Sequence, residues 1–338
     1  MNAVVLEKTG DPISGFVLSN SVPIPSPSPS QLLLKVKSCA LNPVDYKMAQ
    51  YNVLINDPLP LPLGCDVCGE IIQIGSDSSE ESFKVGDLVF GYTGLGTIGY
   101  GTFAEFCVIE KSLAMKTSNG ALTHPQLSSV GVGLETAALG LFQSLSLTIS
   151  DEPKENLPKI LIWGASSSVG MFAVQLASIC GYPVIAVCSE SNFDFMKSLG
   201  ATYTVSYRDS NAAVNEIRSL PGGPPLHAYS TISSDASNLC AKSVSGENSI
   251  VAACAGGITE SVDGVESKDV FLGMIPKNED QTKYLSTLIP TFNRWFDNGK
   301  LKPGKILLMN GLQSIFEGLS TLSQGKVSGE KIVISLEP

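Results

Sequence analysis

Histidine, tryptophan and charged residues are scarce in this sequence. Its 338 residues include two histidines and two tryptophans, and 16% are charged. Lysine and arginine number 22 against 32 aspartates and glutamates, which gives a net charge of −10. Because nucleic acid and anionic lipid surfaces attract positively charged proteins, this balance argues against either as a partner.

Long apolar runs are also missing. No stretch approaches the ~20 uninterrupted apolar residues that a membrane-spanning helix requires. The N-terminal segment reaches Glu7 after a short apolar run, unlike a secretory signal peptide. We therefore expect a cytoplasmic protein. Hydrophobic residues still make up 43% of the chain, enough for a folded protein of two domains.

The cysteine pattern does not favour a metal site. Eight cysteines are scattered through apolar surroundings, and Cys65 and Cys68 form a single C-x-x-C pair. A structural zinc site would need a second pair at suitable spacing, and none follows. We expect reduced, buried cysteines and no metal.

Two patterns of organisation follow one another along the chain. Up to about residue 120, short apolar runs separated by Gly, Pro, Ser and Asp predict a small β barrel or sandwich. After Thr123 the pattern alternates, which predicts an α/β fold with a doubly wound parallel sheet. The expected strands are 160–163, 184–188, 204–206 and 250–255, and the expected helices are 169–180, 192–199, 212–218, 284–298 and 311–323. A last strand is expected at 331–336.

The sharpest local signal is the turn between the strand 160–163 and the helix that follows it. Its residues, Gly164-Ala-Ser-Ser-Ser-Val-Gly170, are small, so backbone N–H groups and the helix N-terminus can approach a pyrophosphate. A hydrolase elbow is excluded, because its last glycine would fall on Ser168. The alternative is an ordinary strand–helix junction, but the surrounding strand–helix–strand unit favours nucleotide binding. The expected phosphate contacts are Ser166, Ser167, Ser168, Val169 and Gly170.

The end of the second strand bears on the choice of dinucleotide. Enzymes that use NAD usually carry an acid there, which accepts hydrogen bonds from the ribose. Here that position is Cys188, followed by Ser189, Glu190, Ser191 and Asn192. Hydroxyl and amide donors suit a 2′-phosphate, so NADPH is favoured if Glu190 points to solvent. An inward Glu190 would favour NADH.

Several further segments resemble one known family over nearly the whole chain. The sequence Ala40-Leu-Asn-Pro-Val-Asp-Tyr-Lys-Met48, together with segments 64–70, 83–91, 101–106 and 325–334, is similar to the zinc-independent quinone-oxidoreductase and enoyl-reductase branch of the medium-chain dehydrogenase/reductase superfamily. This resemblance implies a GroES-like β-barrel catalytic domain, residues 1–122 and 305–338. It also implies a Rossmann NADPH-binding domain, residues 123–304.

Within that family, Asn192–Ala201 and Ser206–Asp209 most resemble fungal trans-acting enoyl reductases of polyketide biosynthesis. The resemblance implies that Ser189, Asn192 and Tyr207 approach the 2′-phosphate of NADPH. The alternative for Tyr207 is a packed loop aromatic. Leu272 is expected to frame the nicotinamide amide, and Gly131–Thr136 to line the nicotinamide end.

The resemblance also implies the reaction, which is reduction of an α,β-unsaturated thioester carried by a polyketide synthase. The zinc-dependent branch would place ligands near Asn42–Asp45 and on Cys65, and its structural cysteines near residues 90–105, where this chain has none. Lys47 and Tyr51 are the candidate catalytic polar groups. Related mitochondrial enoyl reductases carry a tyrosine where this chain has Val53, so the proton donor is left open.

Alternatives to this function remain. The protein could reduce free quinones or small enals, or it could reuse the fold as a non-redox cyclase or synthase partner. The glycine-rich stretch 91–101 is either a lid over the substrate or a loop between barrel strands. Relatives dimerise through a Rossmann edge strand, placed here near Ile250–Ala255, but the acidic residues that follow in Glu260–Asp269 favour a monomer.

Overall fold

The chain forms two units and crosses between them at residues 132/133 and 272/273. The computed structural model describes residues 1–77, 83–152 and 156–337. Unit 1 comprises Met1–Val132 and Gly273–Pro338, and unit 2 comprises Gly133–Leu272. In the described part of the chain, no helix is long and apolar enough to cross a membrane.

The sequence suggested boundaries at 122/123 and 304/305. Helix α8 (Glu279–Asp297) accounts for the shift of the second boundary, and helix α2 (His124–Ser128), which also belongs to unit 1, lies between the suggested and the observed first boundary. Helix α8 belongs to unit 1 by its contacts, although it follows the strands of the parallel sheet in sequence. Its buried apolar face includes Phe292, Trp295 and Phe296, and the Phe296 ring meets Phe90 edge-on at 5.5 Å between centroids.

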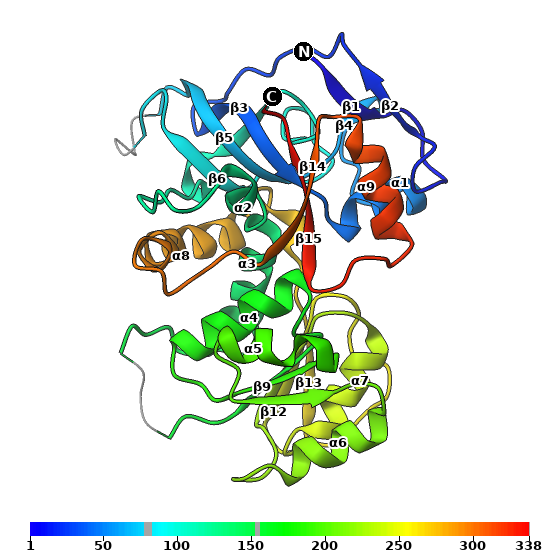
Figure 1. The fold of residues 1–338 in the computed structure, drawn as a ribbon, viewed down its shortest axis with the longest axis vertical. Helices are drawn as coiled ribbons and strands as arrows, with labels where there is room; N and C mark the ends of the chain where they lie inside the picture. The colour runs from blue at the N-terminus through cyan, green and yellow to red at the C-terminus, as the bar shows by residue number, and fades with distance from the viewer. Residues whose placement is uncertain (78–82, 153–155, 338) are drawn as a thin grey trace. The chain divides into compact units, whose positions relative to one another are not determined.

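Unit 1 is built from two sheets, in line with the β-rich pattern of its sequence. The smaller has the order β2–β1–β4, and the larger has the order β14–β15–β3–β5–β6, with β7 also paired to β3. β15 pairs antiparallel with β3, so the end of the chain completes the unit that its beginning forms (Figure 1). The strands are β1 (Ala3–Leu6), β2 (Phe16–Ser19), β3 (Gln31–Ala40), β4 (Leu61–Pro62), β5 (Asp66–Ile74), β6 (Leu88–Tyr92), β7 (Phe106–Glu110), β14 (Lys305–Asn310) and β15 (Glu330–Ser335).

Helix α1 (Pro43–Tyr51) interrupts the part of the chain for which only strands were expected. Pro43 occupies its first turn, and the Asp45 carboxylate accepts a hydrogen bond from the Asn42 backbone N–H at 2.7 Å. This local capping starts a helix despite the β-rich surroundings. The other helical segments outside unit 2 are η1 (Lys111–Leu113), α2 (His124–Ser128), α9 (Ser314–Ser323) and η4 (Leu272–Met274), which spans the second crossing.

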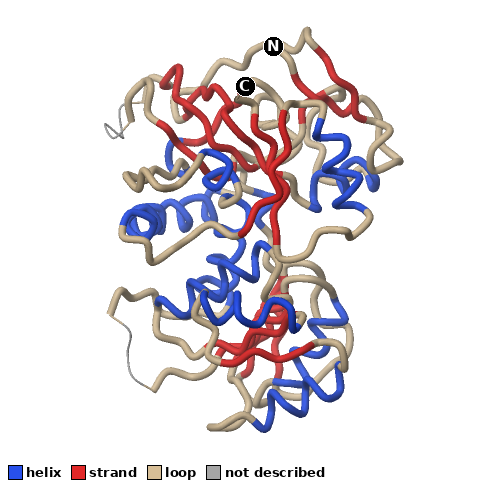
Figure 2. Tube along the Cα trace, in the orientation of Figure 1, coloured by secondary structure: helices blue, strands red, loops and turns tan. Residues whose placement is uncertain are grey.

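Unit 2 contains the doubly wound parallel sheet that the alternating pattern predicts, and this prediction is confirmed. The six parallel strands have the order β10–β9–β8–β11–β12–β13. Helices α4 and α5 lie on one face and α6 and α7 on the other (Figures 1 and 2). The elements are β8 (Ile160–Trp163), α4 (Ser168–Ile179), β9 (Val184–Cys188), η3 (Glu190–Asn192), α5 (Phe193–Ser198), β10 (Tyr203–Ser206), α6 (Ser210–Ser219), β11 (His227–Ser230), α7 (Ser234–Ser243), β12 (Ser249–Ala253) and β13 (Val265–Asp269). Helix α3 (Gly131–Ala138) and the π-helix η2 (Leu139–Ser144) lead into this unit.

The two edge strands of this sheet are β10 and β13, so the placement of an edge strand near Ile250–Ala255 is wrong. β12 is paired on both sides, with β11 and with β13. β13 has the sequence Val-Glu-Ser-Lys-Asp and is largely exposed, so periodicity of apolar residues could not reveal it. The edge therefore carries the acidic segment itself.

The glycine-rich stretch 91–101 is a hydrogen-bonded loop. The backbone N–H of Asn56 donates to the Gly96 carbonyl at 2.7 Å, and the Ile98 N–H donates to the Asp57 carboxylate at 2.7 Å. The Tyr100 hydroxyl donates to Glu110 at 2.5 Å. These bonds tie the stretch to the segment after α1 and to β7, which favours the loop alternative over a free lid.

Candidate dinucleotide-binding site

The phosphate turn, Gly164–Gly170, has no room for side chains at its two glycines. Gly164 adopts φ +82°, and a Cβ there would lie 2.6 Å from the Thr231 hydroxyl. A Cβ on Gly170 would lie 2.2 Å from the Gly164 carbonyl oxygen. Glycine is therefore required at both positions, which lets the first turn of α4 sit directly against the end of β8.

Ser167 holds the phosphate turn in shape. Its Oγ accepts a hydrogen bond from the Gly170 N–H at 3.0 Å and lies 2.9 Å from the Thr231 Oγ1. This hydroxyl is thus engaged within the protein. The N–H groups of Ser168 and Val169 lie in the first turn of α4, where no intrahelical acceptor exists, and they form the positive end of the helix dipole. The turn therefore fits a pyrophosphate.

Thr231 belongs to this site, although the sequence did not identify it. It directly follows β11, whose last residue, Ser230, pairs with Trp163 at the end of β8. From β8 the chain continues to β9 on one side of the sheet, and from β11 it continues to β12 on the other side. Dinucleotides bind at the point between two such strands, where the strand order reverses. Strand β11 was not among the strands expected from the sequence, so Thr231 could not be placed at the end of a strand.

A second polar group lies at the same carboxyl edge. Cys188 and Ser206 are paired at the ends of β9 and β10, so Ser189 and Tyr207 follow adjacent strands. The Asn192 side-chain amide donates to the Ser189 Oγ at 2.9 Å. Tyr207 is 45% exposed, so its reading as a packed aromatic is wrong. Glu190 is exposed to solvent.

The remaining predicted site residues lie elsewhere. Leu272 is buried and opens η4, three residues after β13 ends. Lys47 and Tyr51 belong to unit 1, on α1, and both are exposed. The Lys47 side chain makes no hydrogen bond or ion pair within the described residues. The structure thus gathers Ser166–Gly170, Ser189, Asn192 and Tyr207 at one edge of one sheet.

A buried polar cluster occupies the part of unit 1 where the zinc-dependent branch would place ligands. The Lys331 ammonium lies 3.0 Å from the Asp66 carboxylate, and the Asn42 amide donates to the same carboxylate at 2.9 Å. Burial, with a contribution from the Asp66 charge, raises the pKa of Asp45 to about 7. Among the described residues, no group of three or more His, Cys, Asp or Glu is arranged to hold a metal ion.

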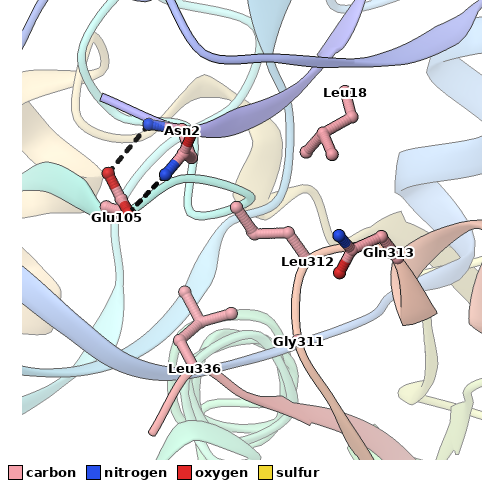
Figure 3. A pocket seen from close by; sticks show the side chains of 7 residues that line it. All are labelled: Asn2, Leu18, Glu105, Gly311, Leu312, Gln313 and Leu336. Atoms are coloured by element: carbon pink, nitrogen blue, oxygen red, sulfur yellow. Dashed lines mark hydrogen bonds between the residues drawn. The ribbon is translucent and has the colours of Figure 1, made fainter. Parts of the chain in front are cut away.

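A separate pocket of about 300 Å³ lies in unit 1 and contains none of the predicted site residues. Figure 3 shows Glu105 on its wall, held by two hydrogen bonds from Asn2, each 2.8 Å long. Its other lining residues are Leu18, Gly311, Leu312, Gln313 and Leu336.

Three features together define a dinucleotide-binding protein. They are the glycines that leave no space for a side chain, the capped helix at the switch point and the hydroxyl groups at the ends of the neighbouring strands. Family models agree with this class. The model of the alcohol dehydrogenase GroES-like domain matches residues 28–119, and the model named zinc-binding dehydrogenase matches residues 168–272.

Individual proteins are similar over most of the chain. The trans-enoyl reductase RAP2 of Pyricularia oryzae is 29% identical over 97% of both chains. The trans-enoyl reductase TOXD of Cochliobolus carbonum is 34% identical over 66% of this chain and 74% of its own. An alcohol dehydrogenase superfamily protein from Novosphingobium aromaticivorans superposes with a TM-score of 0.84, at 26% identity and full coverage of both chains.

The chain belongs to the medium-chain dehydrogenase/reductase superfamily and lies near the fungal trans-enoyl reductases. Its unit 1 is the GroES-like part and its unit 2 the Rossmann part of that fold, as the resemblance implied. The fold binds a nicotinamide dinucleotide, and the protein is an oxidoreductase.

Proposed function

We propose that this protein is an NADPH-dependent enoyl reductase that acts in trans on an α,β-unsaturated thioester carried by a polyketide synthase. The observation that carries the proposal is the similarity to several proteins named trans-enoyl reductases, at 26–34% identity. The phosphate turn and the polar groups beside it support the cofactor part of the proposal.

The preference for NADPH rests on the end of β9. Cys188 stands where NAD enzymes usually carry an acid, and Ser189 and Asn192 form a hydrogen-bonded pair beside the exposed Tyr207. These groups offer neutral donors to a 2′-phosphate. Glu190 is exposed, which is the arrangement that favours NADPH.

Replacing Ser189 by aspartate should reverse this preference. The new carboxylate would repel a 2′-phosphate and accept hydrogen bonds from an unmodified ribose, so we expect the NADPH-to-NADH affinity ratio to fall at least about tenfold, or ~1.4 kcal/mol. Fluorescence titration with each nucleotide measures the ratio. Ser198→Asp places the same charge on the exposed side of α5 and is the control. Equal ratios in the two variants would contradict the assignment.

When bound, the nicotinamide supplies the hydride that reduces the carbon–carbon double bond. Negative charge then develops on the thioester oxygen, and a positioned cation or donor lowers the energy of that state. Lys47 is exposed and free of partners among the described residues, so its ammonium can donate to this oxygen. Tyr51, one helical turn further along α1 and 61% exposed, is a second donor.

Lys47→Met should lower kcat about 100-fold with an enoyl thioester, because loss of one donor to a developing oxyanion costs ~10²–10³ in kcat. NADPH affinity should stay within about threefold of the wild type, because the phosphate turn lies in unit 2. Steady-state kinetics and NADPH titration measure the two quantities. Lys8→Met removes another exposed lysine of unit 1 and should leave both unchanged. An unchanged kcat in Lys47→Met would remove this residue from the mechanism.

A paired-substrate experiment tests the proposal as a whole. NADPH oxidation is followed with one enoyl group presented on a synthase carrier domain, as a free small thioester, and with a free quinone. We expect the highest kcat/KM with the carrier-bound substrate. Equal or higher values with free substrates would support a quinone or enal reductase instead. Absence of NADPH binding would support a non-redox role.

A further inference from the structure

Asp66 and Lys331 form an ion pair in the interior of unit 1. Their side chains are 0% and 7% exposed, and the ammonium lies 3.0 Å from Oδ2 of the carboxylate. Asn42 joins both, accepting a hydrogen bond from Lys331 on its Oδ1 and donating to Asp66 with its amide at 2.9 Å. Burying two charges is costly, so such a pair persists only where its geometry is fully satisfied.

The second carboxylate oxygen of Asp66 holds the start of α3. Its Oδ1 accepts a hydrogen bond from the Val132 backbone N–H at 2.6 Å. The preceding residue is Gly131, and a Cβ there would lie 2.6 Å from the same oxygen and 2.5 Å from the backbone of Gly91. Glycine at this position therefore allows the helix to begin directly on the Asp66 carboxylate.

The residue after Val132 rests on the phosphate turn. Gly133 is the first residue of unit 2, and a Cβ there would lie 2.5 Å from the Ser168 hydroxyl and 2.9 Å from the Phe172 ring. One peptide bond thus separates the N–H that Asp66 holds from the backbone that packs against Ser168. The peptide bond between Val132 and Gly133 therefore connects the residue held by Asp66 directly to the residue that packs against the phosphate turn.

We propose that Asp66 is a positioning residue for hydride transfer, oriented by Lys331 and Asn42, which fixes the first turn of α3 where the chain enters the cofactor unit. The expected effect of Asp66 on catalysis rests on the proposed function. Asp66 acts through Val132 and Gly133, and the bonds that shape the phosphate turn, from Ser167 to Gly170 and Thr231, lie entirely within unit 2. Loss of Asp66 should therefore slow hydride transfer more than it weakens NADPH binding.

Two double variants separate the two roles of the Asp66 carboxylate, which are its charge in the ion pair with Lys331 and its acceptor oxygen for the Val132 N–H. Asp66→Ala with Lys331→Met removes the buried charges together and also the acceptor for Val132. Asp66→Asn with Lys331→Met removes the same charges and keeps an acceptor oxygen. Lys111→Met is the stability control, because Lys111 is another buried lysine of unit 1, held by backbone carbonyls of Pro29 and Gly75 at 2.9 and 3.0 Å.

Amide hydrogen exchange is the first readout and needs no turnover. In Asp66→Ala/Lys331→Met, the amides of Val132 and Gly133 should exchange about 10- to 100-fold faster than in the wild type, as loss of a hydrogen bond to a charged group implies. Asp66→Asn/Lys331→Met and Lys111→Met should leave these two amides within about threefold of the wild type. Unchanged exchange in the alanine variant, or the same increase in Lys111→Met, would overturn the inference.

Kinetics supply the second readout. We expect kcat of the alanine double variant, expressed per NADPH-binding site, to fall at least about tenfold relative to the wild type. The primary deuterium isotope effect measured with deuterated NADPH should be larger than in the wild type. The affinity for NADPH should stay within about threefold of the wild-type value. The asparagine double variant should recover most of kcat. If exchange accelerates while kcat and the isotope effect stay unchanged, the positioning role is wrong. A wild type inactive with every enoyl thioester would refute the proposed function, and the exchange result would still decide whether Asp66 holds α3.

Discussion

Gly170→Ala is expected to weaken NADPH binding by about 5- to 150-fold. The added Cβ would lie 2.2 Å from the Gly164 carbonyl oxygen and 2.7 Å from the Ala165 Cα, both backbone atoms that cannot rotate away. The phosphate turn must then open, at a cost of ~1–3 kcal/mol for an overpacked site, equivalent to about 5- to 150-fold in affinity. Helix propensity alone favours alanine over glycine by ~1 kcal/mol, so a loss can only come from this contact.

Fluorescence titration with NADPH and thermal unfolding measure the effect of Gly170→Ala. The matched control is Gly120→Ala, because a Cβ at Gly120 meets no atom within 4 Å. We expect the control to bind NADPH like the wild type. If both alanine variants bind NADPH equally well, the turn from Gly164 to Gly170 does not hold the pyrophosphate.

The second large effect concerns the pH dependence of stability and arises from Asp45. This carboxyl group is fully buried, and burial raises its pKa from 3.8 to about 7. Between these values the folded state binds more protons than the unfolded state. The stabilising contribution of the neutral group is therefore fully present below about pH 4 and is lost as the pH rises towards 7.

Asp45→Asn removes this titration and keeps an oxygen that can accept the hydrogen bond from the Asn42 backbone N–H. From pH 5 to pH 8, we expect the variant to gain about 2–3 kcal/mol in free energy of unfolding relative to the wild type. Urea unfolding at several pH values measures this difference. Asp235→Asn, which changes an exposed carboxylate on α7, is the control. A constant difference in free energy of unfolding between Asp45→Asn and the wild type across this range would mean that Asp45 is ionised throughout.

The sequence was most informative where function depends on neighbouring residues. Strand β8 runs through the phosphate turn into α4 within one short segment, so apolar periodicity and small residues predict both the fold and the phosphate contacts. The absence of an acid at Cys188 could also be read directly. Alternating apolar strands and amphipathic helices then predict the parallel sheet, because each element must bury one face on its neighbour.

Local pattern failed where strand or helix type depends on distant partners. Strand β13 is a polar edge and shows no apolar alternation, so β12 was taken for the edge. Helix α1 was missed for a different reason: its cap, formed by Asn42, Pro43 and Asp45, is local but lies inside a β-rich region. Helix α8 has the amphipathic pattern that was expected, but no periodicity says which unit will bury its apolar face.

By itself, the sequence determined the doubly wound sheet and the glycine-bounded turn, since these follow from residues close together in the chain. The superfamily came from the resemblance of several segments spread over nearly the whole chain. Only the tertiary structure brought Thr231 to Ser167, and Lys331 to Asp66 from opposite ends of the chain. Such contacts are set by strand order and burial. A buried charge is stable only beside its partner, and no local pattern identifies a partner that sheet topology supplies.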